Sequence, residues 1–301
     1  MQSTLYLGID GGGSKCHAVL YRQGDGIIGT GVAGPANPLQ GYERALESIL
    51  EAAALAAADA GLPVDATETM VAGLGLAGLN LRAQHQRMQQ WAHPFARAYL
   101  STDLEIACLG AHDGADGGVV IAGTGSSGYV RVGKLVRIIG GTGFPAGDTG
   151  SGAWLGLMAL KAVFEAADGL APPTALTDLV ERHVGASGRE VAERIAGATT
   201  SVYAGLAPLV FDAVRDGDAT AIGIVREGAA YLGRMVRKLK ECNPPRLSLI
   251  GGVAPSIHAW LDEDVQQALS PALASPAMGA VLLARAGDRR TAAGRRLASQ
   301  P

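Results

Sequence analysis

Two glycine-rich turns contain the residue types that bind phosphate. The first, "GIDGGGSK" (residues 8–15), places Asp10 and then Gly11, Gly12 and Gly13 after a short apolar run. Glycines let backbone N–H groups approach a ligand oxygen closely and take positive φ angles, so this turn can cradle a phosphate. Asp10 adds a carboxylate that can hold Mg²⁺ directly or through water. A hairpin that only reverses the chain explains this stretch equally well.

The second turn, "GTGSSG" (residues 123–128), matches the G-x-G-x-x-G pattern of dinucleotide-binding proteins. That fingerprint requires a helix directly after the turn, because the pyrophosphate binds the helix N-terminus. The residues that follow, "YVRVGKLVRII", are typical of β-strands instead. We therefore reject the dinucleotide interpretation, and the sequence has no G-x-x-x-x-G-K-[ST] motif. We predict a second phosphate turn, in which Thr124 and Ser126 supply hydroxyl groups.

Short strands are predicted to position the first turn. Apolar runs separated by glycines predict three antiparallel strands within residues 4–34. A helix over residues 38–61 follows, and four apolar residues have helical spacing in it: Ala45, Ile49, Ala52 and Leu55. The next predicted elements are a buried strand (69–79), a helix (82–92) and a strand (97–102) that ends at Asp103.

The same order of elements recurs in the second half of the chain. Residues 117–141 predict a strand, the second turn and two further strands, and residues 150–168 predict a helix. A long helical region over about 174–240 comes next, then a strand (246–252) and a helix (255–269). The repeat predicts an internally duplicated α/β protein with two lobes.

Five motifs, in this order, resemble a known family: "GIDGGGSK", "STDLEIACLGAHDG", "GGVVIAGTGSSG", "GGTGFPAGDTGSGAWLG" and "LIGGVAPSI". The set is similar to the N-acetylglucosamine and glucosamine kinase branch of the BadF/BadG/BcrA/BcrD ATPases, in the actin, hexokinase and Hsp70 superfamily. The resemblance covers residues 5 to about 285. It implies two ribonuclease-H-like (actin-like ATPase) lobes, the first over 1–110 with the C-terminal helix 286–301 as a candidate to complete it. The second lobe is expected over 111–285, with a helical insertion at about 170–240.

The resemblance also implies ATP- and Mg²⁺-dependent phosphorylation of the 6-hydroxyl of N-acetylglucosamine, or alternatively of glucosamine, with ATP held by both turns. Asp103 matches the catalytic base, and a positioned carboxylate is what phosphoryl transfer from a sugar hydroxyl needs. Asp10 is the residue expected at the metal. The implied sugar-binding residues are Asn37, Asp103, Ser126, Ser127, Gly141, Thr142, Gly143, Phe144 and Asp148. The implied ATP-binding residues are Gly11, Gly12, Gly13, Ser14, Lys15, Gly123, Thr124, Gly125, Ala207, Gly251, Gly252 and Ser256.

Several of these residues also have simpler interpretations. Asp103 can be an N-cap of the helix that follows it, and Asp148 can be a cap of the "TGSGAWLGL" helix. Asn37 before a proline is typical of a turn, and Lys15 can face solvent instead of phosphate. The animal enzymes carry tryptophan and histidine where this chain has Thr142 and Phe144, so the resemblance leaves the recognition of the acetyl group open.

Composition excludes other classes of function. A formal charge of -3 with 48% apolar residues is typical of a soluble protein and argues against a nucleic-acid partner. No apolar run approaches the roughly 18 residues of a membrane span, and we expect a cytoplasmic protein, by the resemblance a homodimer. Cys16, Cys108 and Cys242 are too scattered for the shared iron–sulfur cluster of a BadF-type redox activator, the alternative from another class. A sugar-sensing regulator of this fold would need a DNA-binding domain before the first strand, and we expect none.

Overall fold

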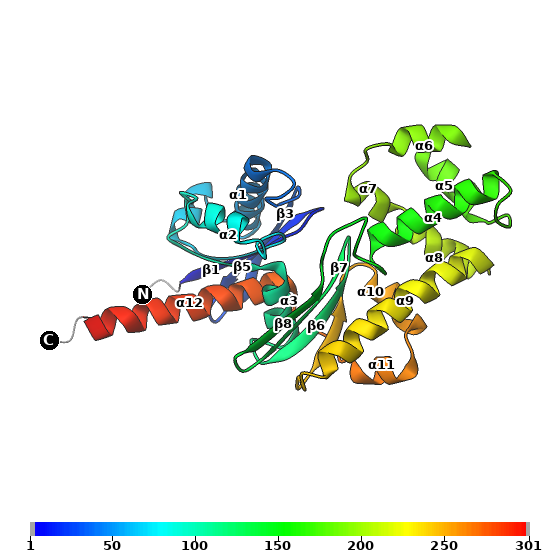
Figure 1. Ribbon diagram of the computed structural model, residues 1–301. Helices are drawn as coiled ribbons and strands as arrows, with labels where there is room; N and C mark the ends of the chain where they lie inside the picture. The colour runs from blue at the N-terminus through cyan, green and yellow to red at the C-terminus, as the bar shows by residue number, and fades with distance from the viewer. Residues whose placement is uncertain (1–3, 299–301) are drawn as a thin grey trace. The chain divides into compact units, whose positions relative to one another are not determined.

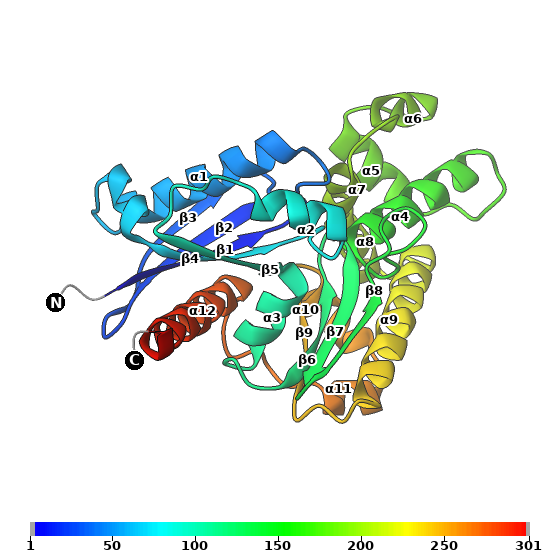
Figure 2. The same ribbon diagram turned by 60° about the vertical axis from the view of Figure 1, so that its left-hand side comes forward.

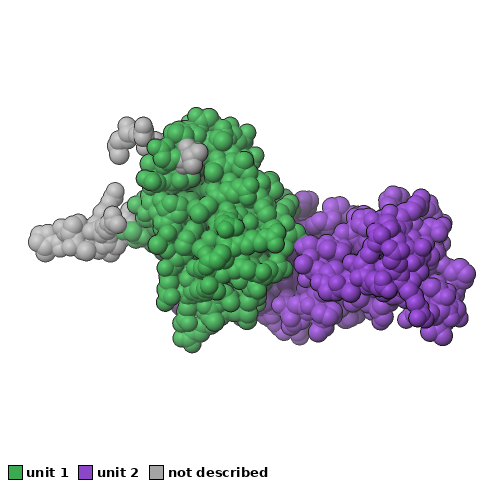
Figure 3. Space-filling model, turned by 90° about the horizontal axis from the view of Figure 1, so that it is seen from above, with its two compact units in different colours: residues 1–116, 272–301 green, residues 117–271 purple. Residues whose placement is uncertain are grey.

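The computed structural model describes residues 4–298, which fall into two compact units (Figures 1 and 3). Unit 1 runs to Asp116 and resumes at Ala272, and unit 2 is Gly117–Pro271. These boundaries differ from the expected lobes, 1–110 and 111–285. The last helix, α12 (Pro276–Ala298), is assigned to unit 1 from its first residue, whereas the expected segment began at residue 286.

Unit 1 is built on a five-stranded sheet with the order β3-β2-β1-β4-β5. Its strands are β1 (Leu5–Gly11), β2 (Cys16–Arg22), β3 (Gly26–Ala33), β4 (Val71–Leu76) and β5 (Arg97–Thr102). Its helices are α1 (Tyr42–Asp59), the short 3-10 helix η1 (Val64–Thr69), α2 (Arg82–Gln89), α3 (Asp103–Ala111) and α12. The first three strands are antiparallel, whereas β4 runs parallel to β1 and β5 to β4. The predicted strands and helices of this half are confirmed.

Alternating residues of β1 face two different helical layers. Leu7 and Ile9 belong to the core under α1, while Tyr6 packs with residues of α12. Figure 2 shows α1 and α12 on opposite faces of this sheet. A Cβ at Gly8 or Gly73 would overlap the backbone carbonyl oxygens of α12, so glycine lets that helix lie directly on the strands. Helix α12 is therefore an integral layer of unit 1.

The buried face of α1 differs from the prediction at one residue. Ala45, Ile49 and Ala52 are buried as expected, but Leu55 is 44% exposed and Ala56 is fully buried. At about 100° per residue, Leu55 lies about 280° around the helix from Ala45, whereas Ala56 returns to within about 20° of it. Helical phase, and not side-chain size, decides which of the two residues faces the sheet.

Unit 2 repeats this arrangement with a four-stranded sheet in the order β8-β7-β6-β9. Its strands are β6 (Gly117–Ala122), β7 (Ser126–Val132), β8 (Leu135–Gly140) and β9 (Leu247–Ile250). Its larger helices are α4 (Gly152–Ala167), α5 (Leu176–Val184), α6 (Arg189–Ile195), α7 (Thr200–Gly205), α8 (Ala207–Arg215) and α9 (Ala219–Lys240). Helices α5 to α9 form the predicted helical insertion. The order of its four strands repeats that of β3, β2, β1 and β4 in unit 1, and the predicted α/β class with two lobes is confirmed.

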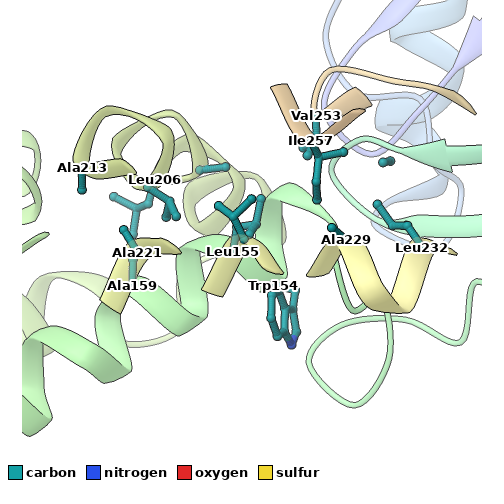
Figure 4. Close-up of a cluster of buried hydrophobic side chains, with 14 of the residues drawn as sticks. Trp154, Leu155, Ala159, Leu206, Ala213, Ala221, Ala229, Leu232, Val253 and Ile257 are labelled. Carbon is teal, nitrogen blue, oxygen red and sulfur yellow. The ribbon is translucent and has the colours of Figure 1, made fainter. Parts of the chain in front are cut away.

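One hydrophobic core joins the insertion to the sheet of unit 2. Figure 4 shows Trp154 and Leu155 of α4, Leu232 of α9, and Val253 and Ile257 around this core. Because residues from the sheet, α4 and the insertion share this core, the insertion supports the strands that carry the second turn.

The single helix predicted over residues 255–269 is wrong. The structure has α10 (Ala254–Ile257), a 3-10 turn η2 (His258–Trp260) and α11 (Glu263–Ala268). Between them, Leu261 takes an extended conformation and is only 5% exposed. Burying Leu261 in the core requires the chain to leave the helical path there, and this tertiary contact overrides the local helical pattern.

Candidate functional site

Two carboxylates lie at one edge of the unit 1 sheet. Asp10 is near the carboxyl end of β1, and Asp103 directly follows β5 as the first residue of α3. Strand β4 separates β1 from β5, and all three run parallel, so their carboxyl ends meet at the same edge. The structure therefore brings together the two residues that the sequence singled out for metal binding and catalysis.

Burial perturbs both groups, and charge repulsion from Asp103 adds to the effect on Asp10. Burial, together with the Asp103 carboxylate, raises the pKa of Asp10 to about 7, although the Lys15 ammonium opposes this. Burial raises the pKa of Asp103 to about 6, against hydrogen bonds from the backbone N–H groups of Leu104 and of Asp103 itself. Paired carboxylates with shifted pKa values are typical of sites that bind a cation or transfer a proton.

Asp103 is not the N-cap of α3. That position is Thr102, whose Oγ1 accepts a hydrogen bond from the Glu105 backbone N–H at 3.2 Å. The Ser101 hydroxyl in turn donates to the Glu105 carboxylate. The capping interpretation of Asp103 is therefore wrong, and its side chain is not needed to begin the helix. The T-x-x-E pattern of a capping box at residues 102–105 was the signal in the sequence that would have identified Thr102.

The first turn is held closely, but not by positive φ angles. None of Gly11, Gly12 and Gly13 has a positive φ, so that part of the expectation is wrong. Glycine is needed at position 11 for close packing instead, because a Cβ there would lie 2.5 Å from Leu76 Cδ2. The Gly12 N–H donates to the carbonyl oxygen of Lys15 at 2.9 Å and closes the turn. Ser14 and Lys15 are exposed at its tip.

Asn37 lies in the loop between β3 and α1. Its Oδ1 accepts a hydrogen bond from the Leu39 N–H at 3.0 Å, which makes an Asx turn. A Cβ at Gly78, which follows β4, would lie 2.7 Å from the same oxygen. The structure thus gives Asn37 the turn geometry that the simpler interpretation predicts, and its role toward a sugar stays a prediction.

In unit 2, the second turn is bonded to the first residues of α4. The Gly152 N–H donates to the Gly123 carbonyl oxygen at 2.8 Å, and the Ala153 N–H donates to that of Thr124 at 3.2 Å. The N-cap of α4 is Ser151, which accepts a hydrogen bond from the Trp154 N–H at 3.2 Å. The interpretation of Asp148 as a helix cap is therefore wrong, since Ser151 fills that position.

Asp148 packs against the second turn with one oxygen unsatisfied. It is 8% exposed and has a φ of 62°, a conformation unusual for a residue with a side chain. Burial raises the pKa of its carboxyl group, while hydrogen bonds from the backbone N–H groups of Gly143 and Ser126 lower it. Its Oδ1 is buried and accepts no hydrogen bond from the described residues. Such an oxygen is suited to receive a donor from a ligand.

Glycine at position 125 is explained by this carboxylate. A Cβ on Gly125 would lie 2.7 Å from Asp148 Oδ2. The neighbouring Ser126 is buried, and its hydroxyl donates to the Thr149 carbonyl oxygen at 2.9 Å. That hydroxyl therefore has a structural partner, which was not expected. Ser127 is partly buried on β7.

The loop before Asp148 contains the other predicted sugar-binding residues. Gly141 and Gly143 have φ angles of 65° and 92°, and Thr142 is exposed. The Phe144 ring packs against the Tyr203 ring of α7, with centroids 4.9 Å apart. Sequence reasoning missed Tyr203, because this residue lies in the helical insertion and matches no motif.

The remaining predicted ATP-binding residues divide into two groups. Gly251 and Gly252 are exposed in the turn after β9, and Ser256 is exposed in α10. Gly251 has a φ of 106°, and a Cβ there would overlap the Ala122 carbonyl oxygen. Ala207 is instead 4% exposed at the start of α8, in the core of unit 2. The structure therefore places Ala207 with the core residues, apart from the exposed turn.

Three known proteins are similar to this chain over most of its length. The chain is 36% identical over 282 residues to glucosamine kinase GspK of Vibrio cholerae, covering 93% of this chain and 95% of that protein. It is 27% identical to an N-acetylmuramic acid/N-acetylglucosamine kinase of Clostridium acetobutylicum, covering 85% and 88% respectively. A Chromobacterium violaceum structure, proposed to be an N-acetylglucosamine kinase, aligns with a TM-score of 0.88 and 31% identity, covering 94% of this chain and all of that one.

The strand order of the two sheets and the similarity to the Chromobacterium violaceum structure assign the actin-like ATPase fold. Within residues 4–298, no helix has the length and apolar character needed to span a bilayer. The family model for the BadF/BadG/BcrA/BcrD ATPases matches residues 7–284. The chain therefore belongs to the BadF/BadG/BcrA/BcrD ATPase family.

Proposed function

We propose that this protein is an ATP-dependent kinase that phosphorylates the 6-hydroxyl of an amino sugar. The observation that carries the proposal is the pair of perturbed carboxylates, Asp10 and Asp103, at the carboxyl edge of the unit 1 sheet. Phosphoryl transfer to an alcohol needs a carboxylate that orients the hydroxyl and accepts its proton, and positive charge near the phosphates. Asp103 is suited to the first task, and Asp10 is suited to the second through a bound cation.

Asp103 is the proposed catalytic base. Its pKa of about 6 leaves it mostly ionised at neutral pH but closer to the working pH than an ordinary aspartate. Because Thr102 caps α3, the Asp103 carboxylate is available for a substrate hydroxyl.

Asp10 is the proposed residue at the metal. Among the described residues, no group of three His, Cys, Asp or Glu side chains could hold a metal ion by itself. Mg²⁺ does not require such a cage, because it is commonly bound through one or two carboxylates, waters and substrate phosphates. A partly buried carboxylate beside a second one has negative charge that a dication would neutralise, so Asp10 fits this ion. When bound, Mg²⁺ would offset charge on the ATP phosphates.

The second carboxylate site is proposed to recognise the sugar. Asp148 Oδ1 is buried without a partner among the described residues, and a sugar hydroxyl is a donor that would satisfy it. The loop 141–144 is proposed to contribute to this recognition, and Asn37 is proposed as a sugar-binding residue of unit 1. Each glycine-rich turn, and the exposed turn at Gly251, is proposed as an ATP-binding segment of its own unit.

N-acetylglucosamine and glucosamine are the two proposed substrates. Glucosamine kinase GspK supports glucosamine, and the two relatives named for N-acetylglucosamine support N-acetylglucosamine. All three are amino-sugar kinases by name. A single pocket difference worth about 1 to 3 kcal/mol decides such a preference. We also propose that the protein is a cytoplasmic homodimer. Light scattering of the purified protein would test the oligomeric state.

A coupled assay of ADP release with a panel of free hexoses and hexosamines tests the function. We expect rapid turnover with N-acetylglucosamine or glucosamine, dependence on Mg²⁺, and a product phosphorylated at the 6-position by NMR. ATP hydrolysis that no sugar accelerates would contradict the proposal. An absorbance scan of anaerobically purified protein tests the redox-activator alternative, because an iron–sulfur cluster absorbs in the visible range.

A further inference from the structure

The loop that leads to Asp148 has little support from regular structure. Its base is fixed where the Gly141 N–H donates to the Ser126 carbonyl oxygen at 3.0 Å. Across the loop, the Gly147 N–H donates to the Gly143 carbonyl oxygen at 2.7 Å. The two glycines at positive φ, Gly141 and Gly143, give this segment more backbone freedom than other residues would. The position of the loop therefore depends on contacts made by its side chains.

The Phe144 ring provides such a contact. It packs against Tyr203 of α7 at a centroid distance of 4.9 Å and an interplanar angle of 48°. Both side chains are partly buried. An aromatic pair at this distance is attractive beyond the area that it buries, and α7 belongs to the insertion and not to the sheet that carries the loop.

Tyr203 itself is fixed by the close approach of α7 to α4. A Cβ on Gly156 would overlap the Tyr203 carbonyl oxygen, and a Cβ on Gly152 would lie 3.3 Å from Ala204 Cβ. The two glycines are one helical turn apart on α4, so the helices touch through their backbones there. The Leu206 N–H also donates to the Tyr203 carbonyl oxygen at 3.0 Å. The backbone of Tyr203 is thus anchored without its side chain.

The same end of α4 holds the second turn. The Gly152 N–H that bonds the Gly123 carbonyl oxygen lies in the helical turn against which α7 packs. On the other side, Gly143, the residue before Phe144, donates its backbone N–H to Asp148. A chain of contacts therefore runs from the second turn through α4 and α7 to the Tyr203 ring, then to Phe144 and the loop beside Asp148.

We propose that Tyr203 is a positioning residue for sugar binding: its ring holds Phe144 and thereby the 141–147 loop in the conformation that binds the amino sugar. The proposal rests on the proposed function, in which this loop and Asp148 contact the sugar. Because the backbone of α7 packs on α4 whatever the side chain at position 203, loss of the ring affects the sugar and not ATP.

The test compares Tyr203→Leu, which removes the ring, with Tyr203→Phe, which keeps it and removes only the hydroxyl. In Tyr203→Leu we expect KM for the amino sugar to rise about 3- to 10-fold, with KM for ATP and kcat within about 2-fold of the wild type. Tyr203→Phe should restore the wild-type sugar KM. Val202→Ala, at an exposed site on the same helix, is the matched control. An unchanged sugar KM in Tyr203→Leu, or an equal rise in KM for ATP, would overturn the proposal.

Two further measurements separate a positioning role from a general loss of structure. The double variant Tyr203→Leu/Phe144→Leu should bind sugar no worse than Phe144→Leu alone, whereas additive losses would contradict the contact. The increase in Tm that the sugar produces, measured against the Tm of each variant without sugar, should be smaller in Tyr203→Leu than in the wild type, and this readout does not need turnover. A wild type that neither binds nor phosphorylates any amino sugar overturns the proposed function. If the wild type is active and Tyr203→Leu has the same KM for the amino sugar, only this inference is overturned.

Discussion

The β1–β2 hairpin of unit 1 and the β6–β7 hairpin of unit 2 are held at equivalent points but surrounded by different chemistry. In unit 1, the Ala77 N–H, just after β4, donates to the Gly11 carbonyl oxygen at 2.8 Å. The Ala36 N–H, after β3, donates to that of Gly12 at 3.0 Å. The hairpin is thus hydrogen-bonded both to the segment after the parallel strand β4 and to the segment after the antiparallel strand β3.

Unit 2 repeats both bonds. The Val253 N–H, after β9, donates to the Ala122 carbonyl oxygen at 2.9 Å, and the Gly152 N–H, after β8, donates to that of Gly123 at 2.8 Å. Since β9 and β8 occupy the places of β4 and β3 in the sheet order, the two halves share one scaffold for a turn. This equivalence is stronger evidence for duplication than the glycine content of either turn.

The surroundings of the hairpins differ. In unit 1 an extended loop precedes α1, and two repelling carboxylates lie at the sheet edge. In unit 2 the amide groups of the first turn of α4 reach the hairpin directly, and Asp148 packs on Gly125. One scaffold therefore supports a site suited to a cation and proton transfer in unit 1, and a site suited to hydroxyl and phosphate ligands in unit 2.

The largest effect that tests this division is expected from Asp103. Asp103→Asn should keep sugar binding but lower kcat by about 10²-fold or more, because the amide cannot accept the hydroxyl proton. Steady-state kinetics and sugar titration measure the two properties separately. Asp113→Asn, an exposed aspartate just beyond α3, is the control. Near-normal turnover of Asp103→Asn would assign the proton transfer to another group.

A smaller effect on catalysis is expected from substitution of Asp10, the second carboxylate at the edge of the unit 1 sheet. Asp10→Asn should raise the Mg²⁺ concentration needed for half-maximal activity by about 10-fold, since it removes a charged oxygen ligand. A magnesium titration at saturating sugar measures this. If the titration curve overlays that of the wild type, unit 1 does not hold the metal through Asp10, and the proposed division between the units loses its basis.

Two glycines of the second turn separate structural from ligand-binding roles. Gly125→Ala should reduce the free energy of unfolding by about 1 to 3 kcal/mol, because the new Cβ would lie 2.7 Å from Asp148 Oδ2. Gly123→Ala meets nothing within 4 Å and has no positive φ, so stability should be unchanged or higher by about 0.4 to 1 kcal/mol. Its KM for ATP should nevertheless rise if the turn contacts phosphate. Denaturant unfolding and kinetics on both variants distinguish these effects, and equal loss of stability would contradict the packing described here.

The smallest expected effect concerns stability and pH. The pKa values of Asp10 and Asp103, about 7 and about 6, lie above the ordinary value of 3.8, so the folded protein binds protons more tightly than the unfolded chain. The resulting stability is fully present below about pH 4 and is lost as the pH rises through 6 and 7. Without ligands at pH 8, Asp10→Asn should therefore raise Tm by at least about 2 to 4 °C, the shift that about 1 kcal/mol produces at this size. The difference should shrink as the pH is lowered to 4, and a difference constant with pH would exclude titration of Asp10 as its cause.

Sequence reasoning predicted the elements around both hairpins well, because their signals are local. Alternating apolar runs interrupted by glycine identify β1 to β3 and β6 to β8 wherever they lie in the fold. The same reasoning placed Asp10 and Asp103 at the ends of strands, which is sufficient to bring them to one edge once the strands are parallel. It offered Asp103 as a cap of α3 only as the alternative to a catalytic role and did not consider Thr102, although two residues able to cap a helix are adjacent there.

The amino-acid sequence by itself determined the strand–turn–strand units, the positions of the glycines and the order of the acids along the chain, because backbone conformation and hydrophobic period act over a few residues. Only the tertiary structure decided that α12 belongs to unit 1 from Pro276 onward, that Leu261 interrupts a helix, that Gly125 makes room for Asp148, and that Tyr203 packs against Phe144. Each of these depends on residues that are far apart in sequence. Close packing, which has no local signature, brings them together.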